Sequence, residues 1–345
     1  MELMRRLGAV LEACKPYLYQ ILIQLCLAIF LILVQIIVSK GISAIVIVVY
    51  EHVLSTIALS LLAFFLEKDR RPSLSFKILC YAFVLGLLQV TLCQMLLTMS
   101  LEFVSSTYQS VALNLVPSIV FALALAFKQE KLKFQSINGQ AKIWGLASSA
   151  AGALALLLWK GPVLLKSTLY KSFMATSAGL IGGTMIVVGI LASAFWHILV
   201  RHVTRKYPAE LSLTAMMNLF GSLQTATVSA FVVKGSSWDL KWDGGLSLIT
   251  VLLGGIMVTG ETYVLVWIIK NKGPVFGSAF NPLLILFSFL LQTFVLGNSP
   301  HLGSVVGAVF VIAGLYLLLW GKAKETEEEQ LNGAVDFIDS PLIQQ

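Results

Sequence analysis

Residues 275–284 read VFGSAFNPLL and continue directly into ILFSFLLQTFVLG at 285–297. This long apolar segment carries an amide and a proline, Asn281-Pro282, close to its start. In a water-soluble core the pair would be a misplaced turn, because proline lacks a backbone N–H and interrupts a helix. In a bilayer, broken helices occur where the backbone lines a cavity or is buried in protein. The segment therefore suggests a functional break in a membrane helix.

The composition of the whole chain also points to the bilayer. The 345 residues are 58% hydrophobic and 12% charged, whereas an ordinary soluble domain has about 25% charged residues. Water cannot accommodate so much apolar surface on a monomer. The net charge of +7 does not indicate nucleic acid, because the basic residues lie between apolar segments. We predict an all-α integral membrane protein with lipid, and no nucleic acid, around it.

Ten segments are candidate membrane spans. A helix that crosses the bilayer needs about 20 mostly apolar residues, and the fifth segment meets this length only if it begins earlier. Its small residues favour close helix packing over lipid contact. The ten predicted spans are 17–38, 44–66, 76–98, 104–127, 143–159, 179–200, 209–233, 244–268, 275–296 and 302–320.

The basic residues predict the orientation of these spans. With the N-terminus in the cytosol, the inside segments carry 18 of the 24 Lys and Arg residues, and this bias favours both termini inside. Residues 1–16 are then a cytosolic N-terminus. Residues 323–345, rich in acids and poor in apolar residues, are expected to form a disordered cytosolic tail.

Two parts of the chain resemble each other. GLASSAAGALALLLWK (145–160) and GAVFVIAGLYLLLWGK (307–322) share six of sixteen positions, and Asn114 and Asn281 are each followed by a proline. These matches predict five-span repeats over 17–160 and 179–322, joined by a loop at 161–178. Because five is odd, the second copy must enter the membrane upside down, which is a recurring transporter architecture.

Several longer motifs resemble one plant family. Together they are similar to the walls-are-thin-related, nodulin 21-like or UMAMIT transporters, of the EamA branch of the drug/metabolite transporter superfamily. The resemblance implies ten helices in two EamA repeats and transport of amino acids or auxin-like compounds. It runs through KPYLYQ (15–20), VVYEH (48–52), NLVPSIVFALA (114–124), LLLWKGP (156–162), KYPAELSLTAMM (206–217), KGPVFGSAFNPL (272–283) and LGSVVGAVFVIAGLYLLLWGK (302–322).

Polar residues at the two broken helices are candidate solute ligands. Asn114 with Pro117, and Asn281 with Pro282, would place an amide beside freed backbone groups in corresponding helices. An amide offers two donors and an acceptor, which suits a zwitterion or a carboxylate. A packing kink with a bonded asparagine is the alternative. We add to the candidate binding residues Gln94 in the third span, and Thr107 and Gln109 near the outer end of the fourth. The alternative for Gln94 is a hydrogen bond between helices.

Two carboxylates within spans are candidates for proton coupling. Glu51 lies in the second span and Glu261 in the eighth, and a charged group in the bilayer must be protonated, paired or facing water. The alternative is that they snorkel to the interface or form a salt bridge. The resemblance implies other residues at both positions, so these carboxylates are departures from the family pattern.

The motifs also bear on the class of protein. The four histidines and four cysteines show no metal-binding spacing, so we expect neither a metal nor another cofactor. His197 and His202 do not share a helical face well, and we do not expect an enzyme. The predicted function is secondary transport of small organic solutes, amino acids first, by alternating access. One alternative is a transporter of auxin or a related metabolite in the vacuolar membrane. A non-transporting receptor or scaffold is the other alternative. We place the protein in the plasma membrane rather than the vacuolar membrane and predict no oligomeric state.

Overall fold

The computed structural model consists of helices wherever it describes regular structure. It describes residues 2–39, 42–68, 71–100, 112–130, 135–158, 177–233, 245–294 and 302–339, with single residues 103, 109 and 132. The helices are α1 (Glu2–Ser39), α2 (Ala44–Leu66), α3 (Phe76–Gly86), η1 (Leu87–Met95), α4 (Leu96–Ser100), α6 (Val116–Ala126), α7 (Ile137–Leu158), α9 (Ser177–Lys206), α10 (Glu210–Val232), α11 (Leu246–Lys272), α12 (Pro274–Ala279), α13 (Asn281–Phe294) and α14 (Leu302–Asp339).

Helices coincide with the predicted spans wherever the spans lie in the described residues. The fifth helix, α7, begins at Ile137, six residues before the predicted start, and so gains the length that its apolar run lacked. The predicted span at 104–127 is described mainly from residue 112 onward, where α6 forms its second half. Residues 161–176, most of the predicted connecting loop, lie outside the described residues.

Length and composition identify six of these helices as able to cross a bilayer, among the residues that the structure describes. Their outer faces carry large apolar side chains, such as Ile57 on α2 and Ile256 on α11, both more than half exposed. Such a surface is suited to lipid and not to water. The protein is therefore an all-α, multi-pass membrane protein. The six helices contain Cys14–Val34, Ile45–Leu66, Phe76–Ser100, Gly179–Lys206, Leu246–Lys272 and Val306–Glu325.

Two of the apolar segments are not regular α-helices. The ninth is divided into α12 and α13 at Phe280, directly before Asn281-Pro282. The third contains η1, a π-helix of nine residues between α3 and α4. A π-helical segment leaves the usual i to i−4 bonding pattern and turns the following side chains to a different face.

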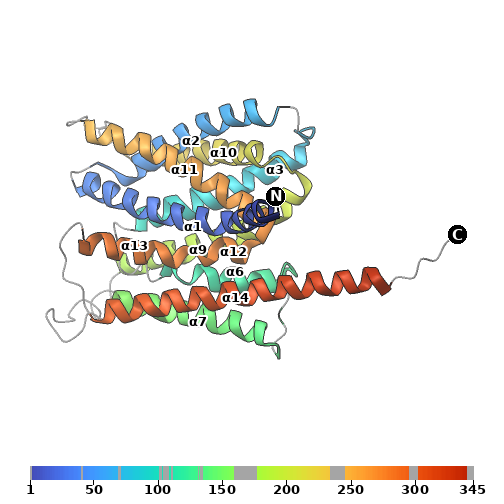
Figure 1. Ribbon diagram of the computed structural model, residues 1–345. Coiled ribbons are helices and arrows are strands. Elements are labelled where there is room, and N and C mark those ends of the chain that lie inside the picture. Colours follow the sequence, from blue (N-terminus) through green and yellow to red (C-terminus); the bar gives the residue numbers. More distant parts are fainter. Residues whose placement is uncertain are drawn as a thin grey trace.

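The helices form a bundle with a distinct two-helix layer on one side (Figure 1). Helices α7 and α14 lie side by side in that layer, while α2, α3, α10 and α11 lie at the opposite side of the bundle. Between them are α1, α6, α9, α12 and α13. The largest cluster of buried apolar side chains extends over α6, α9, α12 and α13.

Glycines allow α7 and α14 to approach backbone to backbone. A Cβ on Gly145 would stand 2.6 Å from the amide nitrogen of Leu318, and a Cβ on Gly152 would stand 2.6 Å from that of Val311. Real side chains do not tolerate such distances, so only glycine fits. The expectation of close helix packing by the small residues of the fifth span is confirmed.

The acidic tail differs from its prediction. Helix α14 continues to Asp339 and projects beyond the bundle on the side where α1 begins (Figure 1). Residues 323–339 are therefore helical rather than disordered. A tail that extends an existing helix avoids the cost of nucleation, and its Glu, Gln, Leu and Ala residues favour a helix. The first residues of the tail also pack, since Glu325 pairs with Lys142 of α7.

Candidate functional site

The break between α12 and α13 brings polar backbone together with polar side chains of α1. Gln20 donates a hydrogen bond from Nε2 to the carbonyl oxygen of Gly277, at 3.1 Å. Gln20 is 2% exposed although it lies on a long apolar helix. A buried amide needs such a partner, because an unsatisfied polar group in an apolar surrounding is costly. The break is thus a polar site inside the bundle.

A small cavity lies at this break. Its polar lining comes from Gln20 and Gln24 of α1, Glu261 of α11 and Asn281 of α13. The volume is about 20 Å³, which holds about one water molecule. Sites for organic ligands usually measure about 300–1,000 Å³. The cavity in this structure is therefore too small for an organic solute.

The other predicted carboxylate, Glu51, is buried. Glu51 of α2 is 2% exposed, and its Oε1 accepts a hydrogen bond of 3.0 Å from Nε2 of Gln94. Its Oε2 has no hydrogen-bond partner among the described residues. The carboxylate fits because Gly254 faces it: a Cβ there would stand 2.7 Å from Oε2. Snorkelling is therefore the wrong interpretation for Glu51.

Glu51 and Glu261 project from α2 and α11, which pack against each other. His52 does not neutralise Glu51 by a close contact, because its Nδ1 is 2.8 Å from the carbonyl oxygen of Val48 and 4.0 Å from Oε1 of Glu51. We refer to these two carboxylates, which lie on neighbouring helices, as the acidic pair.

The π-helix η1 positions the partner of Glu51. Gln94 lies near its end, and Thr91, one turn earlier, reaches α10: its Oγ1 is 3.2 Å from Oγ1 of Thr225. Gln94 was predicted as a solute ligand or as a bond between helices. The structure shows the interhelical bond, because its amide donates to Glu51. Its role in the site is to orient that carboxylate.

The two broken-helix asparagines occupy different cavities. Asn114, 5% exposed, lines a cavity of about 10 Å³ with Pro117 and Ser149 of the α6–α7 side. Asn281 and Pro282 lie at the other break. Asn281 lines the cavity beside Glu261, whereas Pro282 and Asn114 do not. The sequence could not show this, because the side of the helix each asparagine faces depends on how the neighbouring helices pack.

Of the remaining predicted ligands, only Gln109 lies in the described residues, and it does not line the cavity beside Glu261. Gln109 donates a hydrogen bond from Nε2 to the carbonyl oxygen of Leu97 in α4, at 2.7 Å. Thr107 lies outside the described residues. Sequence reasoning missed Gln20 and Gln24, although two glutamines four residues apart on an apolar helix share one face and could have been noticed.

Comparison with known proteins identifies the family. The EamA-like transporter family matches this chain twice, over residues 15–146 and 180–320. The chain belongs to the EamA-like transporter family. The two matches leave out the long segment between them and the end of α14. They divide the helices described above into two groups, α1 to the start of α7 and α9 to α14.

Individual plant relatives cover nearly the whole of this EamA-family chain. It is 34% identical over 347 residues to the WAT1-related protein At5g64700 of Arabidopsis thaliana, covering 95% of each chain. It is 33% identical over 324 residues to the WAT1-related protein At2g37460 of the same plant, covering 91% of this chain and 85% of the relative. The protein is thus a WAT1-related member of the family, and the resemblance seen in its motifs is confirmed.

A solved structure agrees with the fold. A crystal structure of another protein matches with a TM-score of 0.66 over 91% of this chain and 99% of the other, at 14% sequence identity. So low an identity supports the fold alone. The family and the relatives together make the protein a membrane transporter of small solutes.

Proposed function

We propose that this protein is a secondary transporter of amino acids that works by alternating access, with its binding site at the α12–α13 break. One observation carries the proposal: Glu261 and Asn281 line one cavity with Gln20 and Gln24. In a membrane, such an arrangement of ionisable and amide groups beside a broken helix is the usual form of a solute site.

The lining suits both ends of an amino acid. A carboxylate such as that of Glu261 accepts hydrogen bonds from an α-ammonium group, while glutamine and asparagine amides donate to an α-carboxylate and also accept. The cavity in its present size admits neither group. In the proposed cycle the solute enters when the helices around Asn281 move apart on one side, and it leaves on the other.

We further propose that ten helices form two inverted repeats, 17–160 and 179–322. The largest packing contacts support this, because each of them has a counterpart when the repeats are exchanged. In the order of the two repeats, α1 corresponds to α9, α2 to α10, α3 to α11, α6 to α13 and α7 to α14. The contact of α1 with α13 then corresponds to that of α9 with α6, and the contact of α2 with α11 corresponds to that of α10 with α3. The contacts of α2 with α10 and of α7 with α14 each join two corresponding helices. A two-fold axis in the membrane plane produces this pattern.

Glu51 and Glu261 are the proposed proton carriers. Glu51 is buried and its Oε2 has no hydrogen-bond partner among the described residues. A charged carboxylate held in this way inside a membrane is costly, so we expect it to bind a proton during part of the cycle. Release of that proton to the opposite side would couple solute movement to a proton gradient. Gln94 keeps Glu51 in position during the cycle through its hydrogen bond.

The proposed location is the plasma membrane, with both chain ends in the cytosol. The bias of Lys and Arg supports the orientation, as does the placement of the start of α1 and the end of α14 at the same end of the bundle (Figure 1). Immunolabelling of tagged ends in intact and permeabilised plant cells would test both statements.

Flux measurements test the transport proposal. Purified protein in liposomes would be given a panel of labelled amino acids and, separately, labelled indole-3-acetic acid. We expect uptake of at least one amino acid above empty liposomes, with a loss of about tenfold or more in Asn281→Ala. Uptake of indole-3-acetic acid alone would favour the auxin alternative. A folded protein that moves none of these solutes under any gradient would contradict the proposal.

A further inference from the structure

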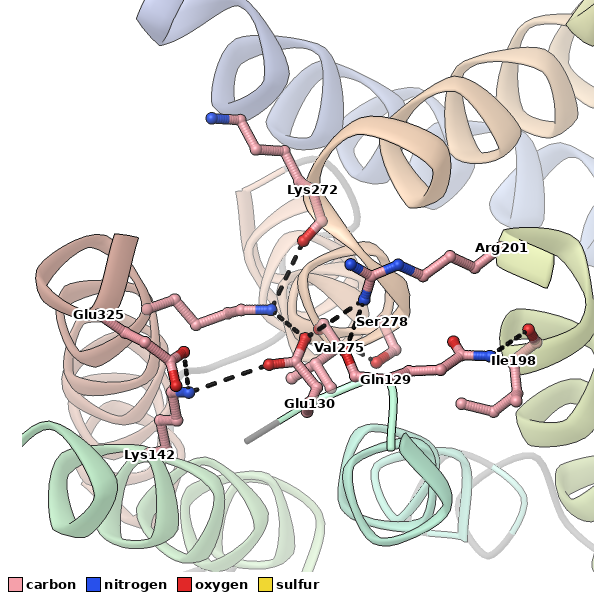
Figure 2. A network of polar contacts seen from close by, with 10 residues as sticks. Gln129, Glu130, Lys142, Ile198, Arg201, Lys272, Val275, Ser278 and Glu325 are labelled. Carbon is pink, nitrogen blue, oxygen red and sulfur yellow. Dashed lines mark hydrogen bonds and ion pairs between the residues drawn. The ribbon is translucent and has the colours of Figure 1, made fainter. Parts of the chain in front are cut away.

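A partly buried cluster of five charged side chains lies near the α11–α12 junction, at the end of the bundle where α1 begins (Figures 1 and 2). Its centre is Glu130, which follows α6 and is 6% exposed in its side chain. Oε1 of Glu130 lies 2.5 Å from Nζ of Lys322 and 3.9 Å from Nη1 of Arg201, and Oε2 lies 3.9 Å from Nζ of Lys142. Lys142 also pairs with Glu325.

The backbone holds Glu130 firmly in place. Helix α6 ends in a tight turn in which Lys128 adopts a φ of 54°, and the amides of Gln129 and Glu130 both donate to the carbonyl oxygen of Ala124. Arg201 then donates to the carbonyl oxygen of Gln129, at 2.9 Å. These hydrogen bonds fix the turn, so Glu130 has little freedom to move with Lys142, Arg201 or Lys322 if one of them changes position.

The junction of α11 and α12 is part of the same contact. Gly273 there has a φ of 94°, and a Cβ on it would stand 2.8 Å from Nη1 of Arg201 and 3.2 Å from Oε1 of Glu130. Glycine is therefore needed both for the backbone conformation and for the space. Only α12, six residues long, separates Gly273 from the break at Phe280, so the cluster lies at one end of the short helix that leads to the solute cavity.

The cluster joins the two stretches that match the EamA family. Glu130 and Lys142 belong to the first stretch, Arg201 to the second, and Lys322 and Glu325 follow the second on α14. Removing one partner of a buried ion pair leaves the other charge uncompensated, which is much more costly than the loss of an exposed pair. The carboxylate of Glu130 faces three cations from three helices, so its loss would affect all of these contacts at once.

We propose that Glu130, Lys142, Arg201, Lys322 and Glu325 form a latch that closes this side of the transporter and must open in each transport cycle. The proposal rests on the proposed function, because alternating access requires each side to open in turn. Glu130 is the positioning residue of the latch and does not contact the solute. When the latch opens, Gly273 and α12 are released from Arg201, and the wall of the cavity at Asn281 can move.

Distance measurements between the two sides of the latch test the proposal without any solute. Spin labels on Ile137→Cys of α7 and Arg205→Cys of α9, two exposed positions, would be introduced after replacement of Cys14, Cys26, Cys80 and Cys93. We expect one dominant short distance in the otherwise unchanged protein. In Glu130→Gln a longer-distance population should rise by about tenfold, because the cations lose their common partner.

A matched control separates the latch from a general effect of charge. Glu327→Gln makes the same chemical change on α14, in an exposed pair with Lys324, and should leave the distances unchanged. The charge exchange Glu130→Lys with Lys322→Glu should restore part of the short-distance population. If Glu130→Gln does not fold, Glu130→Asp, which keeps the charge and shortens its reach, is measured in the same way.

The outcomes distinguish the latch from the proposed function. An unchanged distance distribution in folded Glu130→Gln or Glu130→Asp would overturn the latch, whatever the flux assays show. A longer-distance population in the Glu130 variant, with no change in Glu327→Gln, would support the latch even if the tested solutes were not transported. In that case the failure would lie in the proposed amino-acid specificity.

Discussion

The α-carbon of Gly145 on α7 lies against the carbonyl oxygen of Gly314 on α14, so that a Cβ on Gly145 would stand 2.7 Å from that oxygen. Gly152 meets Gly307 in the same way, also at 2.7 Å. In the internal repeat, Gly145 corresponds to Gly307 and Gly152 to Gly314. The contact between Gly145 and Gly314 therefore corresponds to the contact between Gly307 and Gly152. Residues around a two-fold axis show this pattern.

Substitution at this contact should destabilise the protein. Gly145→Ala forces the backbones of α7 and α14 apart, and overpacking of this kind costs about 1–3 kcal/mol. Gly183→Ala is the matched control, because nothing lies within 4 Å of a Cβ at that position of α9. Thermal unfolding in detergent should show a lower midpoint for Gly145→Ala only. Equal midpoints for the two variants would show that the α7–α14 contact is not tight.

Loss of Gln20 should reduce transport more than it reduces stability. Gln20→Ala removes the hydrogen bond to the carbonyl oxygen of Gly277 and one polar wall of the cavity. Leu22→Ala changes an exposed position on the same helix and should transport normally. We expect solute uptake in liposomes to fall by about tenfold in Gln20→Ala. Normal uptake in this variant would exclude Gln20 from the site.

The acidic pair predicts a dependence on proton gradients. Glu51→Gln and Glu261→Gln should lose the stimulation of uptake by an inward proton gradient, because an amide neither binds nor releases a proton near neutral pH. Solute exchange at equal pH should persist, since it needs no net proton movement. Glu12→Gln, at an exposed position, serves as the control. Stimulation equal to that of the unchanged protein in both variants would remove these carboxylates from the coupling mechanism.

Glu67 should stabilise the contact between α2 and α10. Its Oε1 and Oε2 accept hydrogen bonds from the amides of Leu211 and Ser212, at 2.9 and 2.8 Å, and so cap the start of α10. Loss of such a cap costs about 0.5–2 kcal/mol. Glu67→Ala should therefore lower the unfolding midpoint in detergent, whereas Lys68→Ala, at the exposed neighbour, should not. A midpoint unaffected by Glu67→Ala would contradict this role.

The sequence predicted the helices well because their cause is local. Apolar runs of about 20 residues suffice to indicate membrane helices, and Asn281-Pro282 indicated the break between α12 and α13. The tail was predicted less well, since α14 continues to Asp339. Its acidic composition suggested disorder, but the helix before it already provided the nucleus.

The site was only partly predictable, because it depends on which helix faces meet. Glu51, Glu261 and Asn281 were found as unusual polar residues in apolar segments. The bond from Gln94 to Glu51 depends on the π-helix η1, and no residue pattern that we recognised indicates that irregularity. Lys142 falls between two predicted spans, and its burial, at 1% exposure, depends on contacts such as its ion pairs with Glu130 and Glu325.

Access to Asn281 from both sides of the membrane is the most direct test of the central claim. The variant Asn281→Cys, in an active protein without the four native cysteines, would be treated with a membrane-impermeant maleimide from outside and, separately, from inside. We predict labelling from each side, with protection by transported solute, and none at the lipid-facing control Ile57→Cys. Labelling of the Asn281→Cys variant from one side only, with or without solute and proton gradients, would contradict alternating access at this cavity.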